Sequence, residues 1–136
     1  MLFSSVASAL LATIPLVAAD FHFGHVDYTV TTATGRYYMV LPASETSCLA
    51  AYDFYPKAAY GFTAPTQPLV VDICGKEIAL NTTSGEWYTH GRVIESGVCN
   101  KIMNGTGTRT PLCQTAAFQS TASYLDLLSC PSDICS

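Results

Sequence analysis

Apolar and polar positions alternate with a period of two along much of the chain, which is typical of β-strands with one buried face. In the segment VDYTVTTA, the residues that share a face are Val26, Tyr28, Val30 and Thr32. RYYMVL continues the apolar pattern after ATG, so we expect a hairpin whose turn contains Gly35. The chain is therefore predicted to begin its folded part with two antiparallel strands.

Three later segments extend the β pattern. CLAAYDFY (48–55) predicts a strand, and LVVDICGKEIAL (69–80) predicts two strands or one bent strand with Gly75 in a bulge. EWYTHGRVIE (86–95) predicts a single strand. PKAAYGFTAPTQP contains three prolines and a glycine, and NTTSG consists of turn-forming residues, so we expect loops at both places.

The C-terminal stretch QTAAFQSTASYLDLLSC is compatible with two structures. Its apolar residues at helical spacing are Phe118, Ala122, Leu125 and Leu128. A short helix and a strand therefore fit this segment equally well. Together the segments predict an all-β fold, mainly an antiparallel sandwich or barrel, with at most one short C-terminal helix.

The first residues have the pattern of a secretory signal. Leu2–Ala19 carries no charge and ends in small residues, with Val17 and Ala19 at the positions that signal peptidase reads. Pro15 interrupts the apolar run and no basic residue flanks it, which disfavours a transmembrane helix. We expect residues 1–19 to be removed and residues 20–136 to form one secreted, extracellular domain.

The charge balance narrows the class of partner. Six Lys and Arg against ten Asp and Glu give a net charge of −4, which disfavours nucleic acid and anionic membranes as partners. Only 12% of the residues are charged, so much of the surface is neutral. A surface of this kind suits contact with proteins or carbohydrates, and we expect a monomer.

Six cysteines in a short extracellular chain predict three disulfides. CNKIMNGTGTRTPLC has a glycine-rich centre and indicates a hairpin whose two cysteines face each other, and PSDI is a turn-like insert between the last two cysteines. These local arguments favour the pairs Cys99–Cys113 and Cys130–Cys135, with Cys48–Cys74 left over. The spacing leaves other pairings open.

Residues that could perform catalysis are sparse. On a single strand, Glu86, His90 and Arg92 would share one face, which is the residue set of a guanyl-type ribonuclease. A second histidine would have to come from His22 or His25, and a solvated strand face explains the pattern as well. No nucleophile elbow, phosphate loop or zinc-protease motif is present. We therefore expect a protein that is not an enzyme.

The segment GKEIALNTTSGEWY is similar to the first inhibitory loop of chagasin-type inhibitors of papain-like cysteine proteases. In that family an Asn-Pro-Thr-Thr-Gly loop follows an apolar strand and precedes an aromatic residue. The matching positions here are Asn81, Thr82, Thr83, Gly85 and Trp87. NGTG (104–107) resembles the second, glycine-rich loop, whereas the proline of the first loop and the Arg-Pro-Trp loop are missing. The resemblance implies an immunoglobulin-like sandwich that wedges loops into a protease cleft.

The same residues support a different interpretation. Asn81-Thr82-Thr83 and Asn104-Gly105-Thr106 are both acceptor sequences for N-glycosylation. A glycan on Asn81 would keep that loop out of a narrow cleft, so the two interpretations exclude each other.

At the level of class, the chain resembles small secreted cysteine-rich effectors of fungi. That resemblance implies a role in the extracellular fluid of a host, which is the apoplast if the host is a plant. Our leading hypothesis is a binding protein that inhibits a host papain-like protease, with Tyr60 and Phe62 filling an apolar subsite unless they fold back onto the core. The alternatives are a ribonuclease-like enzyme and a binder of cell-wall carbohydrate, whose candidate stacking rings are Tyr37, Tyr38, Trp87 and Tyr88.

The expected cut would also create a candidate copper site. It would leave Asp20-Phe21-His22 at the amino terminus, where an amine, two amides and an imidazole can bind Cu(II) in a square plane. His25 could add an axial contact. Both histidines could equally well just begin the first strand, and we expect no other cofactor.

Overall fold

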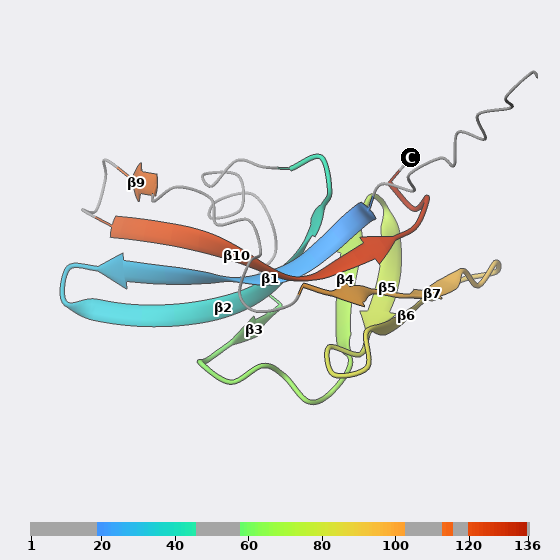
Figure 1. The fold of residues 1–136 in the computed structure, drawn as a ribbon, viewed down its shortest axis with the longest axis horizontal. Coiled ribbons are helices and arrows are strands. Elements are labelled where there is room, and N and C mark those ends of the chain that lie inside the picture. The colour runs from blue at the N-terminus through green and yellow to red at the C-terminus, as the bar shows by residue number, and fades with distance from the viewer. Residues whose placement is uncertain (1–18, 46–57, 103–112, 116–119, 136) are drawn as a thin grey trace, which may run out of the picture.

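The computed structural model describes residues 19–45, 58–102, 113–115 and 120–135, shown in colour in Figure 1. These residues form two antiparallel β-sheets and no helix, and so include no helix that could cross a membrane. The predicted all-β, sandwich-like fold is therefore confirmed. The signal segment up to residue 18, the strand expected at 48–55 and the glycine-rich tip at 104–107 lie outside the described residues.

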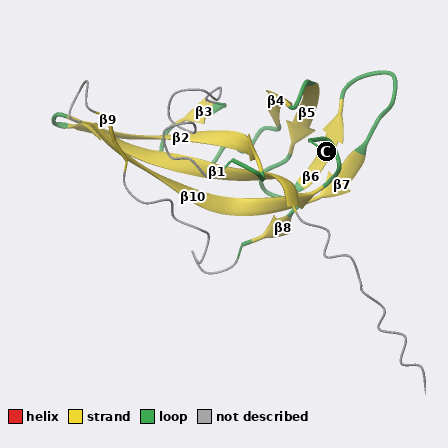
Figure 2. Ribbon diagram, turned by 90° about the horizontal axis from the view of Figure 1, so that it is seen from above, coloured by secondary structure: helices red, strands yellow, loops and turns green. Residues whose placement is uncertain are grey.

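The larger sheet, sheet A, is built on two long strands that pair along their whole length (Figure 2). Its order is β3-β2-β1-β10-β8, and β9 also pairs with β10. Its strands are β1 (Ala19–Val30), β2 (Ala33–Pro42), β3 (Ala59–Tyr60), β8 (Asn100–Lys101), β9 (Cys113–Thr115) and β10 (Ser120–Pro131).

The smaller sheet, sheet B, is a meander in chain order β4-β5-β6-β7. Its strands are β4 (Leu69–Ile73), β5 (Lys76–Leu80), β6 (Glu86–Thr89) and β7 (Ser96–Val98). Strand β7 pairs with β6 in sheet B, and two residues later β8 pairs with β10 in sheet A. The chain therefore crosses between the sheets at Cys99.

The main core joins the two sheets. Alternate residues of each strand point into it, which is why the sequence shows a period of two. Its most buried members are Phe21, Phe23, Tyr38, Ile73, Ile78, Leu80, Trp87, Cys99, Leu128 and Cys130. A second cluster of buried side chains lies on the other face of sheet A and contains Val26, Tyr37, Met39, Leu41, Ala122 and Tyr124. Sheet A is therefore apolar on both faces.

The ambiguous C-terminal segment is a strand. Phe23 and Gly24 of β1 pair with Leu128 and Asp126 of β10, so Leu127 is an extra residue of β10 in a bulge. The bulge moves the apolar residues of β10 from one face of sheet A to the other. The buried residues of β10 still occupy alternate positions, namely Ala122, Tyr124, Leu128 and Cys130. The spacing that resembles a helix arises because Leu125, an apolar residue that is only partly buried, lies between Ala122 and Leu128.

The first hairpin forms as predicted, but its turn lies earlier. The turn is Thr31-Thr32, with Thr31 in the left-handed region at a φ of 53°. Gly35 lies inside β2 opposite Tyr28, where an added Cβ would be 2.3 Å from the Tyr28 hydroxyl oxygen. Gly35 is therefore needed to make room for an aromatic ring rather than to form the turn.

A tight turn also explains Gly75. Residues 69–80 form the hairpin β4–β5, and its two turn residues have positive φ angles, 50° at Cys74 and 76° at Gly75. This is the twist that a two-residue hairpin connection requires, and glycine adopts it without steric cost. Gly75 therefore lies in a turn and not in a bulge.

The predicted disulfide pairing is wrong. The structure contains Cys74–Cys135 and Cys99–Cys130, so Cys99–Cys113, Cys130–Cys135 and Cys48–Cys74 are all excluded. The reason is that Cys99 lies at the crossing between the sheets, beside β10, and bonds across the core rather than along its own hairpin. A third disulfide stays a prediction, and it would have to join Cys48 and Cys113, whose side chains lie outside the described residues.

Candidate functional site

The turn between β5 and β6, residues Asn81 to Gly85, is closed by its own hydrogen bonds. The Asn81 side-chain oxygen accepts from the amides of Thr83 and Ser84 at 3.0 and 3.1 Å. The Gly85 amide donates to the Asn81 carbonyl at 2.7 Å, with Gly85 at a φ of 80°. Asparagine and glycine are thus required by the backbone of this turn. The side chains of Thr83 and Ser84 are exposed.

This turn is tied to the loop between β3 and β4, residues 61–68. The Thr82 hydroxyl donates a 2.6 Å hydrogen bond to the Pro65 carbonyl. The two segments that the sequence singled out separately are therefore neighbours. We call them together the paired loops.

Two large aromatic side chains stand at the start of the paired loops. Tyr60 and Phe62 are 68% and 64% exposed, so neither is folded into the core. The guanidinium of Arg36 lies 5.7 Å over the Phe62 ring, and two hydrogen bonds to Asp27 hold it there. The Tyr38 hydroxyl donates to the Phe62 carbonyl at 3.4 Å. Both the ring and the backbone of Phe62 are thereby positioned.

Trp87 occupies a different place from the one that the family resemblance implies. Its side chain is only 4% exposed and packs edge-on against Phe21, with ring centroids 5.4 Å apart. An added Cβ on Gly97, its cross-strand partner, would lie 2.9 Å from the indole nitrogen. Trp87 is therefore mainly a core residue, and little of its side chain is open to a partner.

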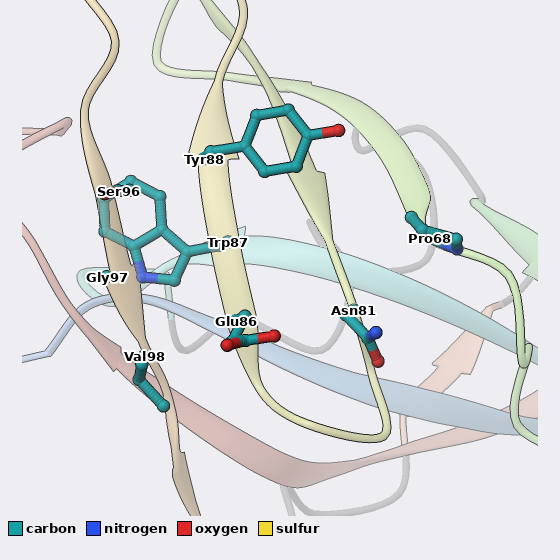
Figure 3. A pocket seen from close by; sticks show the side chains of 8 residues that line it. All are labelled: Pro68, Asn81, Glu86, Trp87, Tyr88, Ser96, Gly97 and Val98. Carbon is teal, nitrogen blue, oxygen red and sulfur yellow. The ribbon is translucent and has the colours of Figure 1, made fainter.

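A hollow of about 440 Å³ lies beside the paired loops on sheet B. Figure 3 shows the residues that line it: Pro68, Asn81, Glu86, Trp87, Tyr88, Ser96, Gly97 and Val98. Glu86 and Val98 are cross-strand partners, as are Tyr88 and Ser96, so these four side chains share the outer face of the sheet. Glu86 accepts a 3.1 Å hydrogen bond from the Ser84 hydroxyl. The hollow thus combines a carboxylate with apolar walls.

The rings proposed for carbohydrate stacking are mostly buried. Tyr37, Tyr38 and Trp87 are each at most 4% exposed, and Tyr88 alone of the four is open to solvent, at 45%. A flat platform needs at least two exposed rings side by side. These four residues do not supply one.

The residues proposed for ribonuclease chemistry are not brought onto one strand. Strand β6 ends at Thr89, so His90 and Arg92 belong to the following loop. The His90 ring pairs with Glu77 at 2.7 Å between Nδ1 and Oε1. The alternation of side chains along a strand therefore stops before His90 and Arg92, so the strand does not place them on one face with Glu86.

The loop between β6 and β7, residues 90–95, was not predicted from the sequence, which indicated a single strand over residues 86–95. Its tip carries Val93 and Ile94, which are 75% and 72% exposed. The available signal was Gly91, which has a φ of 146° and so breaks the supposed single strand. The loop lies at the opposite end of β6 from the Asn81–Gly85 turn, and Figure 2 shows it extending beyond the sheet.

The copper site is not assembled in the structure. Asp20 and His22 lie in β1, where His22 is paired with both Leu41 and Ser129. The His22 Nδ1 atom, which would bind the metal, is hydrogen-bonded to Asp126. Copper binding would require this end of β1 to separate from the sheet, so the site stays a prediction.

A partly buried polar cluster surrounds Asp126. It contains His22 and Tyr124, whose rings meet edge-on at 5.4 Å between centroids. Burial raises the pKa of the Tyr124 hydroxyl well above its ordinary value, and the charge of Asp126 and a hydrogen bond to it raise the pKa further. The folded protein therefore holds Tyr124 in its neutral form.

This cluster predicts a loss of stability at alkaline pH. Tyr124 ionises near pH 10 in the unfolded chain and only at higher pH in the folded one, so its contribution is complete below about pH 10 and is lost above it. In chemical denaturation at increasing pH, Tyr124→Phe should remove part of this decline, whereas Tyr60→Phe, an exposed control, should not. Identical alkaline profiles for wild type and Tyr124→Phe would contradict the prediction.

Comparison with known proteins adds no constraint. The chain matches no family model, no curated protein and no solved structure, so its function has to be argued from the residues and geometry above.

Proposed function

We propose that the protein is a secreted, effector-type binding protein that inhibits a host extracellular enzyme, with a papain-like cysteine protease as the target. The observation that carries this proposal is the Thr82–Pro65 hydrogen bond, which unites the inhibitor-like turn and the aromatic loop in one surface. Disulfides are typical of extracellular proteins, in agreement with a secreted chain.

The paired loops have the properties that binding to a cleft requires. The hydrogen bonds within the Asn81–Gly85 turn fix its backbone before binding, which lowers the ordering cost of association. Tyr60 and Phe62 offer large apolar area at the start of the loop to which Thr82 is hydrogen-bonded. In this account the two rings anchor the complex, and the exposed Thr83 and Ser84 make polar contacts at its rim.

The two alternative functions receive less support. Three of the four rings proposed for carbohydrate stacking are buried, and two of the three ribonuclease residues are off the strand. A glycan on Asn81 remains incompatible with this proposal, because Asn81 lies at the base of the turn and lines the neighbouring hollow.

The proposal predicts that purified protein inhibits at least one member of a panel of papain-like proteases. The double variant Tyr60→Ala/Phe62→Ala should raise the inhibition constant about thirtyfold or more, since loss of a hot spot costs about 2 kcal/mol. Val70→Ala, which alters an apolar side chain with 55% exposure on β4, is the matched control and should change the constant less than about threefold.

Two results would contradict this proposal. One is the absence of inhibition across the panel by protein whose disulfides are intact. The other is inhibition that the double variant and the control lower to the same extent, since the paired loops would then have no special role.

A further inference from the structure

Exposed apolar side chains are concentrated on sheet B. Of the seven large apolar side chains that the described residues expose, five belong to this sheet or to its β6–β7 loop: Val70, Tyr88, Val93, Ile94 and Val98. A single exposed valine is ordinary, but a group of this size on one small sheet indicates a contact surface. The paired loops do not include any of these residues.

The β6–β7 loop is braced at its base. The Thr89 amide donates to the Glu95 carbonyl and the Glu95 amide donates to the Thr89 hydroxyl, both at 2.8 Å. Lys76 forms an ion pair with Glu95 at 2.8 Å. Because Val93 and Ile94 are branched at Cβ, their side chains lose little rotamer freedom on contact. The loop therefore presents a preformed apolar tip.

The hollow on the outer face of sheet B is chemically complementary to this tip. Its walls include Tyr88, Val98 and Pro68, and Glu86 places a carboxylate among them. Arg92 stands immediately before the apolar pair of the tip. Neither Arg92 nor Glu86 has an oppositely charged partner among the described residues. One surface thus offers apolar residues with an unpaired cation, and the other offers apolar walls with an unpaired anion.

We propose that the protein associates with itself, with the tip Arg92–Ile94 of one copy seated in the hollow of the next and Arg92 paired with Glu86 of that copy. The tip and the hollow are different surfaces on sheet B, so the same contact can be made reciprocally in a two-fold dimer or head-to-tail in a ring or chain. The association does not depend on protease inhibition, and it replaces the monomer expected from composition.

A second copy fits the tip better than a membrane does. Several acidic residues lie on the outer face of sheet B and in its loop, namely Asp72, Glu77, Glu86 and Glu95, and the whole chain carries a net charge of −4. These charges repel an anionic bilayer. The hollow of another copy instead offers Arg92 an oppositely charged residue, Glu86.

Sedimentation velocity of the disulfide-intact full chain over a range of protein concentrations tests the proposal. We expect reversible association that Glu86→Arg and Arg92→Glu each weaken about tenfold or more, and that the double variant restores to within about threefold of wild type. Asp72→Arg makes the same charge change on the outer face, outside the hollow, and is the matched control. It should leave the association constant within about threefold of wild type.

The single and double charge-swap variants show whether Arg92 and Glu86 of two copies meet. A wild-type protein that stays monomeric at every concentration overturns the proposal, whether or not it sediments with lipid vesicles. Association that both single variants weaken and the double variant fails to restore also overturns it, because the two residues would then not meet. Association insensitive to Val93→Ser/Ile94→Ser would exclude the tip.

Discussion

Reduction of the Cys74–Cys135 and Cys99–Cys130 disulfides is expected to unfold the protein at room temperature. The two bonds span 61 and 31 residues of sequence, for which the chain-entropy model gives about 4 kcal/mol each. A domain of this size has a total stability of about 5–15 kcal/mol. Removing both constraints therefore takes away most or all of the free energy of unfolding.

Circular dichroism melts of the oxidised and reduced protein measure this effect. The Cys74→Ser/Cys135→Ser and Cys99→Ser/Cys130→Ser variants each remove one bond. They should cost about the same, because the Cys99–Cys130 bond lies inside the Cys74–Cys135 loop and shortens it. A reduced protein that melts cooperatively near the temperature of the oxidised one would show that the two sheets hold together without these bonds.

Trp87→Ala is expected to lower the free energy of unfolding by about 3–5 kcal/mol. The indole is almost fully buried between the sheets, where it contacts Phe21 and covers the backbone of Gly97. Its removal leaves a cavity in the main core that the surrounding strands can fill only in part. The substitution tests the core position of Trp87 against the partner-binding role that the family resemblance implies.

The neighbouring residue provides the control. Tyr88 lies on the same strand as Trp87 but is 45% exposed on the outer face. In urea denaturation, Tyr88→Ala should therefore lower the free energy of unfolding by about 1 kcal/mol or less. Equal costs for the two substitutions would contradict the assignment of Trp87 to the core. If Trp87→Ala instead keeps full stability and loses only inhibition, the family resemblance is the better guide.

The fold class could be predicted because period-two alternation reports local burial. The β1–β2 and β4–β5 hairpins, and the turn at Asn81–Gly85, follow from residues that are near each other in sequence. The turn position at Thr31-Thr32 could not be predicted, because Gly35 is more typical of a turn and its contact with Tyr28 appears only when the strands pair. Local pattern thus predicts strands better than it predicts their ends.

Features that depend on long-range contacts were not accessible from the sequence. Proximity along the chain favoured Cys99–Cys113, whereas the crossing at Cys99 places it beside Cys130. The bulge at Leu127 is defined by pairing with β1, and it moves the buried residues of β10 from one face of sheet A to the other. The burial of Trp87 and the joining of Thr82 to Pro65 likewise require the two sheets and the loops to be in place.

The central claim is that the paired loops are the surface that meets the target enzyme. Amide hydrogen exchange of the protein, free and bound to the protease it inhibits most strongly, tests this claim most directly. Binding should slow exchange in the paired loops, residues 61–68 and 81–85, and leave the β1–β2 turn at Thr31-Thr32 unchanged. Tight binding that leaves the exchange of the paired loops as it is in the free protein, with protection elsewhere, would contradict it.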